Sequence, residues 1–166
     1  MSLVKRVVTA KRFGAASAFL VAVCLSLLLF VWPKFQSYRQ SFLVYSSLNG
    51  SISKMKLALA LGADANQSEC EAANCWTPLV AAAAANQPEA VELLLERGAD
   101  VNKKLKRGQT ALMIASYRGD TEVVRLLISS GADVNADCEG DTALAWARQK
   151  NHAEIISLLV ASGATR

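Results

Sequence analysis

Apolar residues recur over the C-terminal three quarters of the chain at the spacing of a buried helical face. Four successive segments carry them at one set of places: Met55/Leu57/Leu59, Val91/Leu94/Leu95, Val124/Leu127/Ile128 and Ile156/Leu159/Val160. Such spacing predicts amphipathic helices with one face in a core. A glycine follows each segment and ends the predicted helix, at Gly62, Gly98, Gly131 and Gly163.

A shorter apolar segment precedes three of these helices and opens with threonine. Thr77, Thr110 and Thr142 begin the phrases TPLVAA, TALMIA and TALAWA, and a Gly-Ala pair follows each threonine at the same offset. A threonine side chain can cap free backbone amides, and a proline such as Pro78 is preset for the first helical position. We predict short first helices that end at Gly50, Asn86, Gly119 and Asn151, because Gly and Asn most easily adopt the left-handed conformation.

The three threonines recur at almost equal intervals along the chain, which indicates a stacked solenoid. After three of the glycines the chain reads Ala-Asp-Ala/Val-Asn, ending at Asn66, Asn102 and Asn135. Together these phrases resemble the ankyrin repeat over about residues 41–166. The resemblance implies an all-α ankyrin-repeat solenoid of four helix-loop-helix units, at about 41–66, 74–102, 107–135 and 139–166, with caps at both ends.

One position departs from the family pattern. The family usually places a histidine two residues after the proline of its TPLH phrase, whereas this chain has Val80, Met113 and Ala145 there. The polar tie made by that histidine must therefore be absent or replaced.

Residues 13–32 are of a different kind, because they contain no charged residue and are rich in Leu, Val, Phe and Ala. This stretch is long enough to cross a bilayer as a helix, and a repeat solenoid has no second core in which to bury it. We therefore predict one transmembrane helix before the repeats. A cleaved secretory signal is the alternative, but the stretch runs into Phe30 to Lys34 without a small-x-small cleavage site, so an uncleaved signal-anchor is favoured.

The basic residues around this stretch predict its orientation. Lys5, Arg6, Lys11 and Arg12 precede it, and Lys34 and Arg39 follow. The excess before the stretch places residues 1–12, a basic N-terminus, in the cytoplasm. The protein would be single-pass, with its repeats in a bacterial periplasm or an equivalent extracytoplasmic compartment.

Residues 33–40 are predicted as a short juxtamembrane connector. Four aromatic residues fall at helical spacing there and just beyond, namely Phe35, Tyr38, Phe42 and Tyr45. An aromatic ligand cradle is one interpretation, and packing against the first repeat is the one we prefer.

The net charge of +4 divides unevenly along the chain. The segment from Met1 to Gln40 holds six basic and no acidic residues, so the repeats are left with an excess of two acidic residues. Nucleic-acid binding would need a basic surface on the folded domain, so we predict no nucleic-acid partner.

Two of the four cysteines lie in an enlarged loop. Cys70 and Cys75 belong to a ten-residue segment between Asn66 and Thr77, where the next equivalent loop, from Lys103 to Gln109, has seven residues. We predict a local disulfide between them, as expected in an oxidising compartment. Free thiols are the alternative. A metal site would need more ligands, and the C-x-x-C spacing of redox pairs is absent.

No catalytic constellation is present in the sequence. His152 is the one histidine, and it begins the last predicted helix, where the family commonly has a structural histidine. Neither a nucleophile elbow nor a Gly-rich phosphate loop accompanies it. We therefore predict no enzymatic activity, no catalytic or metal-binding residues and no cofactor.

The family resemblance indicates where a partner protein would bind. In ankyrin-repeat solenoids the hairpin tips and the exposed side of the first helices line one concave surface. Carried over to this chain, that surface comprises Asn74, Trp76, Lys104, Lys106, Arg107, Gln109, Tyr117, Arg118, Glu139, Asp141, Gln149 and Lys150. Trp76 is the predicted anchor residue, since exposed Trp, Tyr and Arg most often carry interface energy.

The basic tip formed by Lys103, Lys104, Lys106 and Arg107 has three interpretations. It is a solvated loop, a contact for an acidic partner, or a contact for anionic lipid headgroups. Our functional hypothesis is a membrane-tethered protein-protein interaction module with a scaffold or accessory role outside the cytoplasm. The alternatives are an immunity-type inhibitor of an enzyme or toxin, and a scaffold that faces the cytoplasm.

Overall fold

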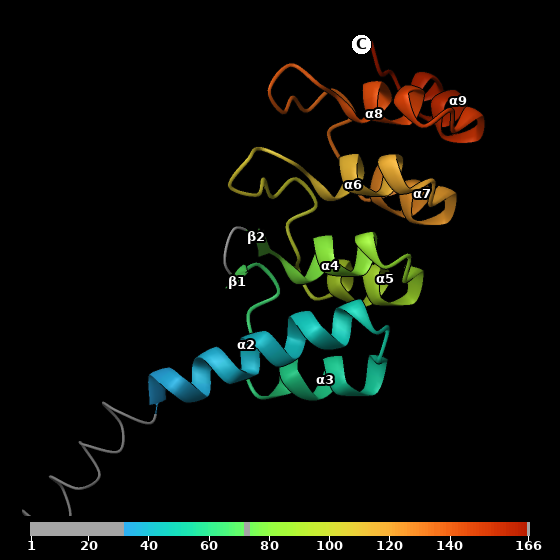
Figure 1. The fold of residues 1–166 in the computed structure, drawn as a ribbon. Helices are drawn as coiled ribbons and strands as arrows, with labels where there is room; N and C mark the ends of the chain where they lie inside the picture. The colour runs from blue at the N-terminus through green and yellow to red at the C-terminus, as the bar shows by residue number, and fades with distance from the viewer. Residues whose placement is uncertain (1–31, 72–73, 166) are drawn as a thin grey trace, which may run out of the picture. The chain divides into compact units, whose positions relative to one another are not determined.

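The computed structural model describes residues 32–71 and 74–165. Their elements follow in the order α2 (Trp32–Leu48), α3 (Ile52–Ala60), β1 (Glu69–Glu71), β2 (Asn74–Trp76), α4 (Pro78–Ala84), α5 (Pro88–Glu96), α6 (Ala111–Arg118), α7 (Thr121–Ser129), α8 (Ala143–Gln149) and α9 (Ala153–Ala161). The chain divides into two units between Tyr38 and Arg39, and the repeats lie in the second unit, Arg39–Arg166. In this unit the pairs α4/α5, α6/α7 and α8/α9 stack one on another (Figure 1).

The N-terminal predictions fall mostly outside the described residues. This applies to the basic N-terminus, 1–12, and to the predicted anchor, 13–32, apart from Trp32. No helix within the described ranges combines the length and the apolar character needed to cross a bilayer. The predicted connector, 33–40, is helical, because α2 runs without a break from Trp32 to Leu48.

The predicted helix starts and ends are confirmed. The Oγ1 atoms of Thr77, Thr110 and Thr142 accept hydrogen bonds from the backbone amides of Val80, Met113 and Ala145, at 3.2, 3.4 and 3.4 Å. All eight residues predicted to end helices have positive φ: Gly50, Gly62, Asn86, Gly98, Gly119, Gly131, Asn151 and Gly163. Local capping chemistry thus sets the starts of α4, α6 and α8, and a residue with positive φ follows the end of each helix in the repeats.

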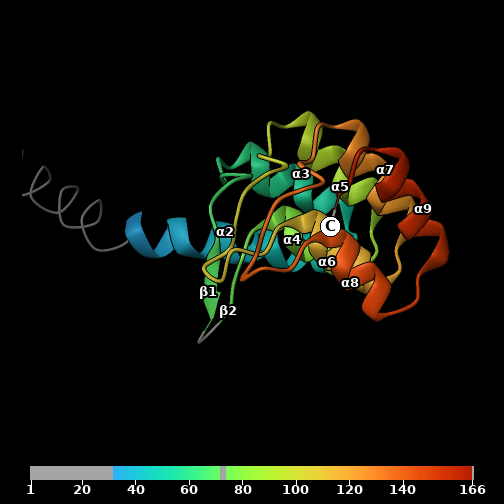
Figure 2. The ribbon, with the colours of Figure 1, turned by 90° about the horizontal axis from the view of Figure 1, so that it is seen from above.

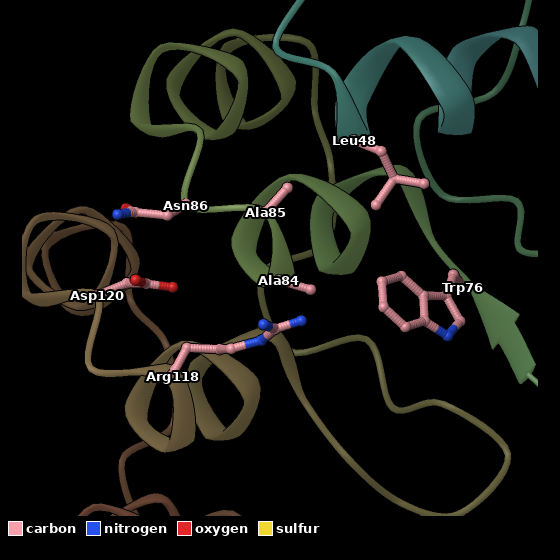
Figure 3. A pocket seen from close by; sticks show the side chains of 7 residues that line it. All are labelled: Leu48, Trp76, Ala84, Ala85, Asn86, Arg118 and Asp120. Atoms are coloured by element: carbon pink, nitrogen blue, oxygen red, sulfur yellow. The ribbon is translucent and has the colours of Figure 1, made fainter.

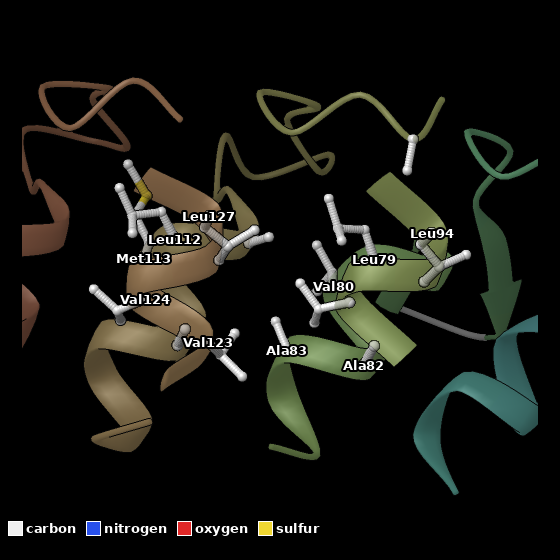
Figure 4. Close-up of a cluster of buried hydrophobic side chains, with 14 of the residues drawn as sticks. Leu79, Val80, Ala82, Ala83, Leu94, Leu112, Met113, Val123, Val124 and Leu127 are labelled. Atoms are coloured by element: carbon white, nitrogen blue, oxygen red, sulfur yellow. The ribbon is translucent and has the colours of Figure 1, made fainter. Parts of the chain in front are cut away.

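The second helices α3, α5, α7 and α9 bury one face in a core shared by all the repeats. Leu94, Leu127 and Leu159 occupy equivalent positions and are completely buried. They join apolar residues of the first helices, such as Leu112 and Met113 in α6, in one continuous cluster (Figure 4). Each repeat therefore completes its core with residues of its neighbours, as expected for a solenoid.

Two residues of the predicted buried faces are instead exposed. Leu57 in α3 has 54% of its surface accessible, and Val160 in α9 has 51%. In α3 the buried residues are Met55 and Ala58, which are three positions apart, whereas Met55, Leu57 and Leu59 alternate and cannot share one helical face. Because α9 is the last described helix, no further repeat in the described chain covers Val160.

Asparagine side chains tie successive repeats together. Asn66 Nδ2 donates to the carbonyl of Gly98 at 2.9 Å, and its Oδ1 accepts from the amide of Asp100. Asn102 makes the same two bonds one repeat later, and Asn135 bonds the carbonyl of Gly163 and the amide of Thr165. These bonds bridge successive repeats in a chain that lacks the family histidine.

The enlarged loop adds a short hairpin to the predicted all-α fold. Strands β1 and β2 pair antiparallel with Glu69 opposite Trp76, Cys70 opposite Cys75 and Glu71 opposite Asn74. The fold remains almost entirely helical in the described residues, and this one two-stranded hairpin is the correction to the all-α prediction.

The aromatic stripe of α2 does not pack as a whole. Phe42 contacts the core, whereas Tyr38 and Tyr45 have 75% and 63% of their surface exposed. In the repeat unit, the buried side of α2 consists of Gln40, Leu43, Val44, Ser46 and Ser47. Gln40 Nε2 donates to the carbonyls of Asp64 and Gln67. Polar contacts therefore hold this part of α2 in addition to the apolar contacts of Phe42, Leu43 and Val44.

Candidate protein-binding surface

The first helices and the loops border one open face of the repeat unit. Viewed along the stack, the loops project away from the helix pairs on the side of α4, α6 and α8 (Figure 2). We call this the inner face; it comprises the side of α4, α6 and α8 nearest the loops, the end of α2, the loops 103–109 and 136–141, and residues 67–71 and 74–76. The second helices, α3, α5, α7 and α9, form the outer side.

The predicted binding residues whose side chains are described belong to the loops and to the first-helix ends that border this face. Those in the loops are Trp76, Lys104, Lys106, Arg107, Gln109, Glu139 and Asp141, and those at the ends of first helices are Tyr117, Arg118, Gln149 and Lys150. The backbone of Asn74 forms the start of β2. Trp76 differs from its prediction, because it is half-buried and packs partly against the core instead of projecting freely.

An aromatic and cationic cluster joins the ends of α6 and α8. The rings of Tyr117 and Trp146 meet edge to face with centroids 5.8 Å apart. The Nζ of Lys150 lies 4.4 Å from the centroid of the Tyr117 ring, a cation–π contact. Tyr117 and Lys150 belong to the predicted binding surface, whereas Trp146 was not predicted there. Trp146 lies one helical turn after Thr142.

The inner face is hollowed over α4. A depression of about 450 Å³ is lined by Leu48, Trp76, Ala84, Ala85, Asn86, Arg118 and Asp120. In Figure 3 the indole of Trp76 and the side chain of Leu48 border it on one side, and Arg118 extends across it from α6. Only Trp76 and Arg118 of these residues were predicted.

A second, smaller hollow of about 120 Å³ lies beside the loop 103–109. Predicted residues Trp76, Lys106, Arg107 and Gln109 line it together with Cys75, Val80, Leu105 and Ile114. Trp76 therefore borders both hollows.

The basic tip is partly held by the next loop. Lys104 Nζ donates to the backbone carbonyl of Asp137 at 3.4 Å, and the thiol of Cys138 donates to the carbonyl of Arg107 at 2.9 Å. Burial raises the pKa of the Cys138 thiol, and the neighbouring carboxylates of Glu139, Asp137 and Asp141 raise it further. Cys138 is thus a structural thiol that keeps its proton at neutral pH.

The cysteines of the hairpin face each other in the backbone register. Cys70 and Cys75 pair directly across β1 and β2, and Cys75 is disulfide-bonded. The identity of its partner cysteine stays a prediction. In the described part of the chain, no group of three His, Cys, Asp or Glu side chains is arranged to hold a metal ion.

His152 links the third and fourth repeats. Its Nε2 lies 3.1 Å from the carbonyl oxygen of Tyr117, and its half-buried ring sits directly over Gly119. This contact agrees with the structural role that the family resemblance implied.

Asp120 lies beside His152 at the edge of the large hollow. Burial raises the pKa of its carboxyl, an effect that electrostatic interactions with Arg118 and His152 partly offset. Its Oδ2 is buried without a hydrogen-bond partner, and its side chain makes no bond to the start of α7. Burial therefore disfavours the ionised form of the Asp120 carboxyl relative to its protonated form.

We expect Asp120→Asn to raise the free energy of unfolding at pH 7, because it removes a desolvated charge and no capping bond. The parent's carboxyl binds its proton more tightly folded than unfolded. Its stability should therefore rise relative to the variant as pH falls through the folded-state pKa towards the ordinary value of 3.8. Urea denaturation of both proteins between pH 7 and pH 4 measures this convergence.

The exposed Glu122, in the first turn of the same helix, provides the control. Glu122→Gln removes a charge that favours the helix start, so it should leave stability unchanged or lower it. If Asp120→Asn is less stable than the parent at pH 7, attraction to Arg118 and His152 outweighs the cost of burial.

Most residues that line the large hollow were not predicted, because an alanine such as Ala84 or Ala85 has no functional group that would suggest a binding role. The sequence does hold an indirect one: Ala84 aligns with Leu48 in the first repeat and with Tyr117 in the third. A small residue in one repeat, where the repeats before and after it have bulky ones, predicts a depression.

The comparisons agree with the geometry of the stack. The family described as "Ankyrin repeats (3 copies)" matches residues 15–105 and 100–165. Among curated proteins, the chain is similar to the 2-5A-dependent ribonuclease of Mus musculus, with 39% identity over 75 residues, which is 45% of this chain and 10% of that protein. With its matched residues, capped helix pairs and repeated loops, the chain belongs to the ankyrin-repeat family.

Proposed function

We propose that this protein binds a partner protein on its inner face and performs no chemistry of its own. Ankyrin repeats indicate a protein-protein interaction module. The observation that carries the proposal for this face is the set of aromatic and cationic side chains gathered there, namely Trp76, Tyr117, Trp146, Arg118 and Lys150. These residue types dominate the energy of interfaces.

We do not infer a ribonuclease activity for this chain from the name of that relative. The match covers 10% of that protein and falls in its repeats. The family is generally a non-catalytic interaction module, which agrees with a binding role.

A photo-crosslinking amino acid at position 106 tests the binding face. Lys106 is exposed on the inner face and borders the small hollow, whereas Lys54 is exposed on α3 of the outer side. In cells that produce the protein, we expect one discrete crosslinked protein from position 106 and none from position 54. Lys106→Glu should then weaken binding of that identified protein, with Lys54→Glu as the matched control.

Crosslinking from position 54 alone, or from neither position, would contradict the proposal. If an identified partner is an enzyme, its assay with purified protein separates the roles. A scaffold leaves the enzyme active, whereas an inhibitor of the immunity type abolishes its activity.

We also propose that residues 13–32 anchor the repeats to a membrane, with residues 1–12 in the cytoplasm and the repeats outside it. Support comes from the uncharged apolar stretch and from the excess of basic residues before it. The disulfide-bonded state of Cys75 agrees with an oxidising compartment, and Cys70, its neighbour in the hairpin register, is the proposed partner.

Reporter fusions after Arg166 test the orientation, one active only in an oxidising compartment and one only in the cytoplasm. Thiol alkylation of Cys70 and Cys75, before and after reduction, tests the disulfide. We expect activity outside and alkylation only after reduction. Activity inside, with both thiols free, would reverse the orientation and remove the disulfide, and partners would then be sought in the cytoplasm.

A further inference from the structure

The hollow over α4 arises because one repeat lacks the side chains that its neighbours carry. Ala84 aligns with Leu48 in the repeat before it and with Tyr117 in the repeat after it, which are 36% and 40% exposed. Ala85 likewise aligns with Asn49 and Arg118. Thr77 and Thr110 cap α4 and α6 in the same way, and a hollow lies over α4 at the places where α6 carries the larger side chains of Tyr117 and Arg118.

The walls of this hollow are mainly apolar. Leu48 of α2, Trp76 of β2, Ala84 of α4 and Ala85 directly after it contribute carbon surface (Figure 3). A concave apolar site with a few polar groups at its edge is the usual form of a binding pocket. At protein interfaces such pockets receive the buried side chains that carry most of the affinity.

The charges around the hollow select the kind of chain that can enter. Helices α4, α6 and α8 contain no acidic residue, and Arg118 and Arg148 close the last turns of α6 and α8. Lys150 follows directly after α8 and lies over Tyr117. By contrast, the outer helices α5, α7 and α9 carry Glu89, Glu92, Glu96, Glu122 and Glu154.

The one acidic residue at the hollow does not reverse this preference. Asp120 lies at the far edge beside Asn86, and its Oδ2 is covered from solvent. Arg118 is exposed, and its side chain extends across the hollow from α6 (Figure 3). A bound segment would therefore meet the guanidinium group of Arg118 before the covered carboxylate oxygen.

We propose that the hollow over α4 receives one bulky apolar side chain from an acidic segment of the partner protein, with Arg118 and Lys150 binding the flanking carboxylates. The proposal rests on the proposed function, since it assigns the chemistry of the partner that the inner face binds. Apolar contact supplies the anchor, and the charge pairs fix the position of the segment.

The repeats themselves supply the test variant. Ala84→Tyr places in the second repeat the residue that the third repeat already holds at the equivalent position, so the fold should accept it while the hollow is filled. Ala84→Leu, which copies the first repeat, is a second variant should tyrosine disturb the fold. Ser129→Tyr, at an exposed position of α7 on the outer side, is the matched control.

The probe is a phage-displayed library of short random peptides selected against the parent. We expect enriched peptides with a Leu, Phe, Tyr or Trp among Asp and Glu residues. For a synthetic peptide of that sequence, Ala84→Tyr should raise Kd about tenfold or more, and Arg118→Glu with Lys150→Glu should do the same. Ser129→Tyr should leave Kd unchanged.

Enrichment of basic peptides, no enrichment at all, or equal affinity for the parent and Ala84→Tyr would overturn the inference. The proposed function is tested separately. If Lys106→Glu weakens binding of a partner but Ala84→Tyr does not, the partner binds the inner face without using the hollow. The proposed function then stands and the inference about the hollow fails. A partner that neither variant affects argues against both proposals.

Discussion

Replacing Leu127 with alanine is expected to lower the free energy of unfolding by about 2–5 kcal/mol, the range for a buried leucine that leaves a cavity. Leu127 is completely buried in α7, which packs between α5 and α9. The cavity would open in the middle of the stack, where two neighbouring repeats depend on the same helix. Urea unfolding followed by circular dichroism measures the loss.

Leu57→Ala is the matched control for this prediction. It removes the same atoms from a leucine that is 54% exposed on α3, so we expect a change within about 0.5 kcal/mol. If Leu127→Ala and Leu57→Ala lower the free energy of unfolding equally, burial of Leu127 in the shared core does not determine the stability of the stack.

Replacing Gly119 with alanine should destabilise the protein by about 2–3 kcal/mol, from left-handed strain and a lost polar contact. Gly119 has a φ of +91°, and a Cβ there would come within 2.6 Å of the His152 ring. Because the ring is held against the carbonyl of Tyr117, it can move only by losing that contact. Thermal unfolding compares the variant with the parent.

Gly131→Ala separates the two causes. Gly131 has a similar φ, +85°, but no atom lies within 4 Å of its added Cβ, so only the backbone strain remains, about 1–2 kcal/mol. In a protein that already carries His152→Ala, the cost of Gly119→Ala should fall to that of Gly131→Ala. An unchanged cost would mean that the imidazole does not limit the substitution.

The helix boundaries of this fold follow from residues that act locally. Thr77, Thr110 and Thr142 cap helices through their own hydroxyl groups, and Gly or Asn ends each helix through its own backbone preference. Such chemistry needs no knowledge of the rest of the molecule. The nearly constant interval between the threonines can be counted in the sequence, and it predicts the stacking of the helix pairs.

Features that depend on neighbouring repeats were harder to predict. The half-burial of Trp76 is such a feature, because it depends on the core residues against which the indole packs. The candidate binding residues in the loops could be named from the family pattern, because each hairpin projects at the same point of its repeat. The hollow over Ala84 could not, since its walls come from three segments whose side-chain sizes matter only after stacking.

The asparagine bridges have a mechanical consequence for the stack. Asn66, Asn102 and Asn135 each fasten one repeat to the next where a second helix passes into a loop. Near the opposite side of the stack, α7 and α9 are joined by the exposed ion pair of Arg125 and Glu154. We expect the bonded line of asparagines to behave as a hinge and the exposed pair to open and close, so that bending changes the curvature of the inner face while each helix pair stays rigid.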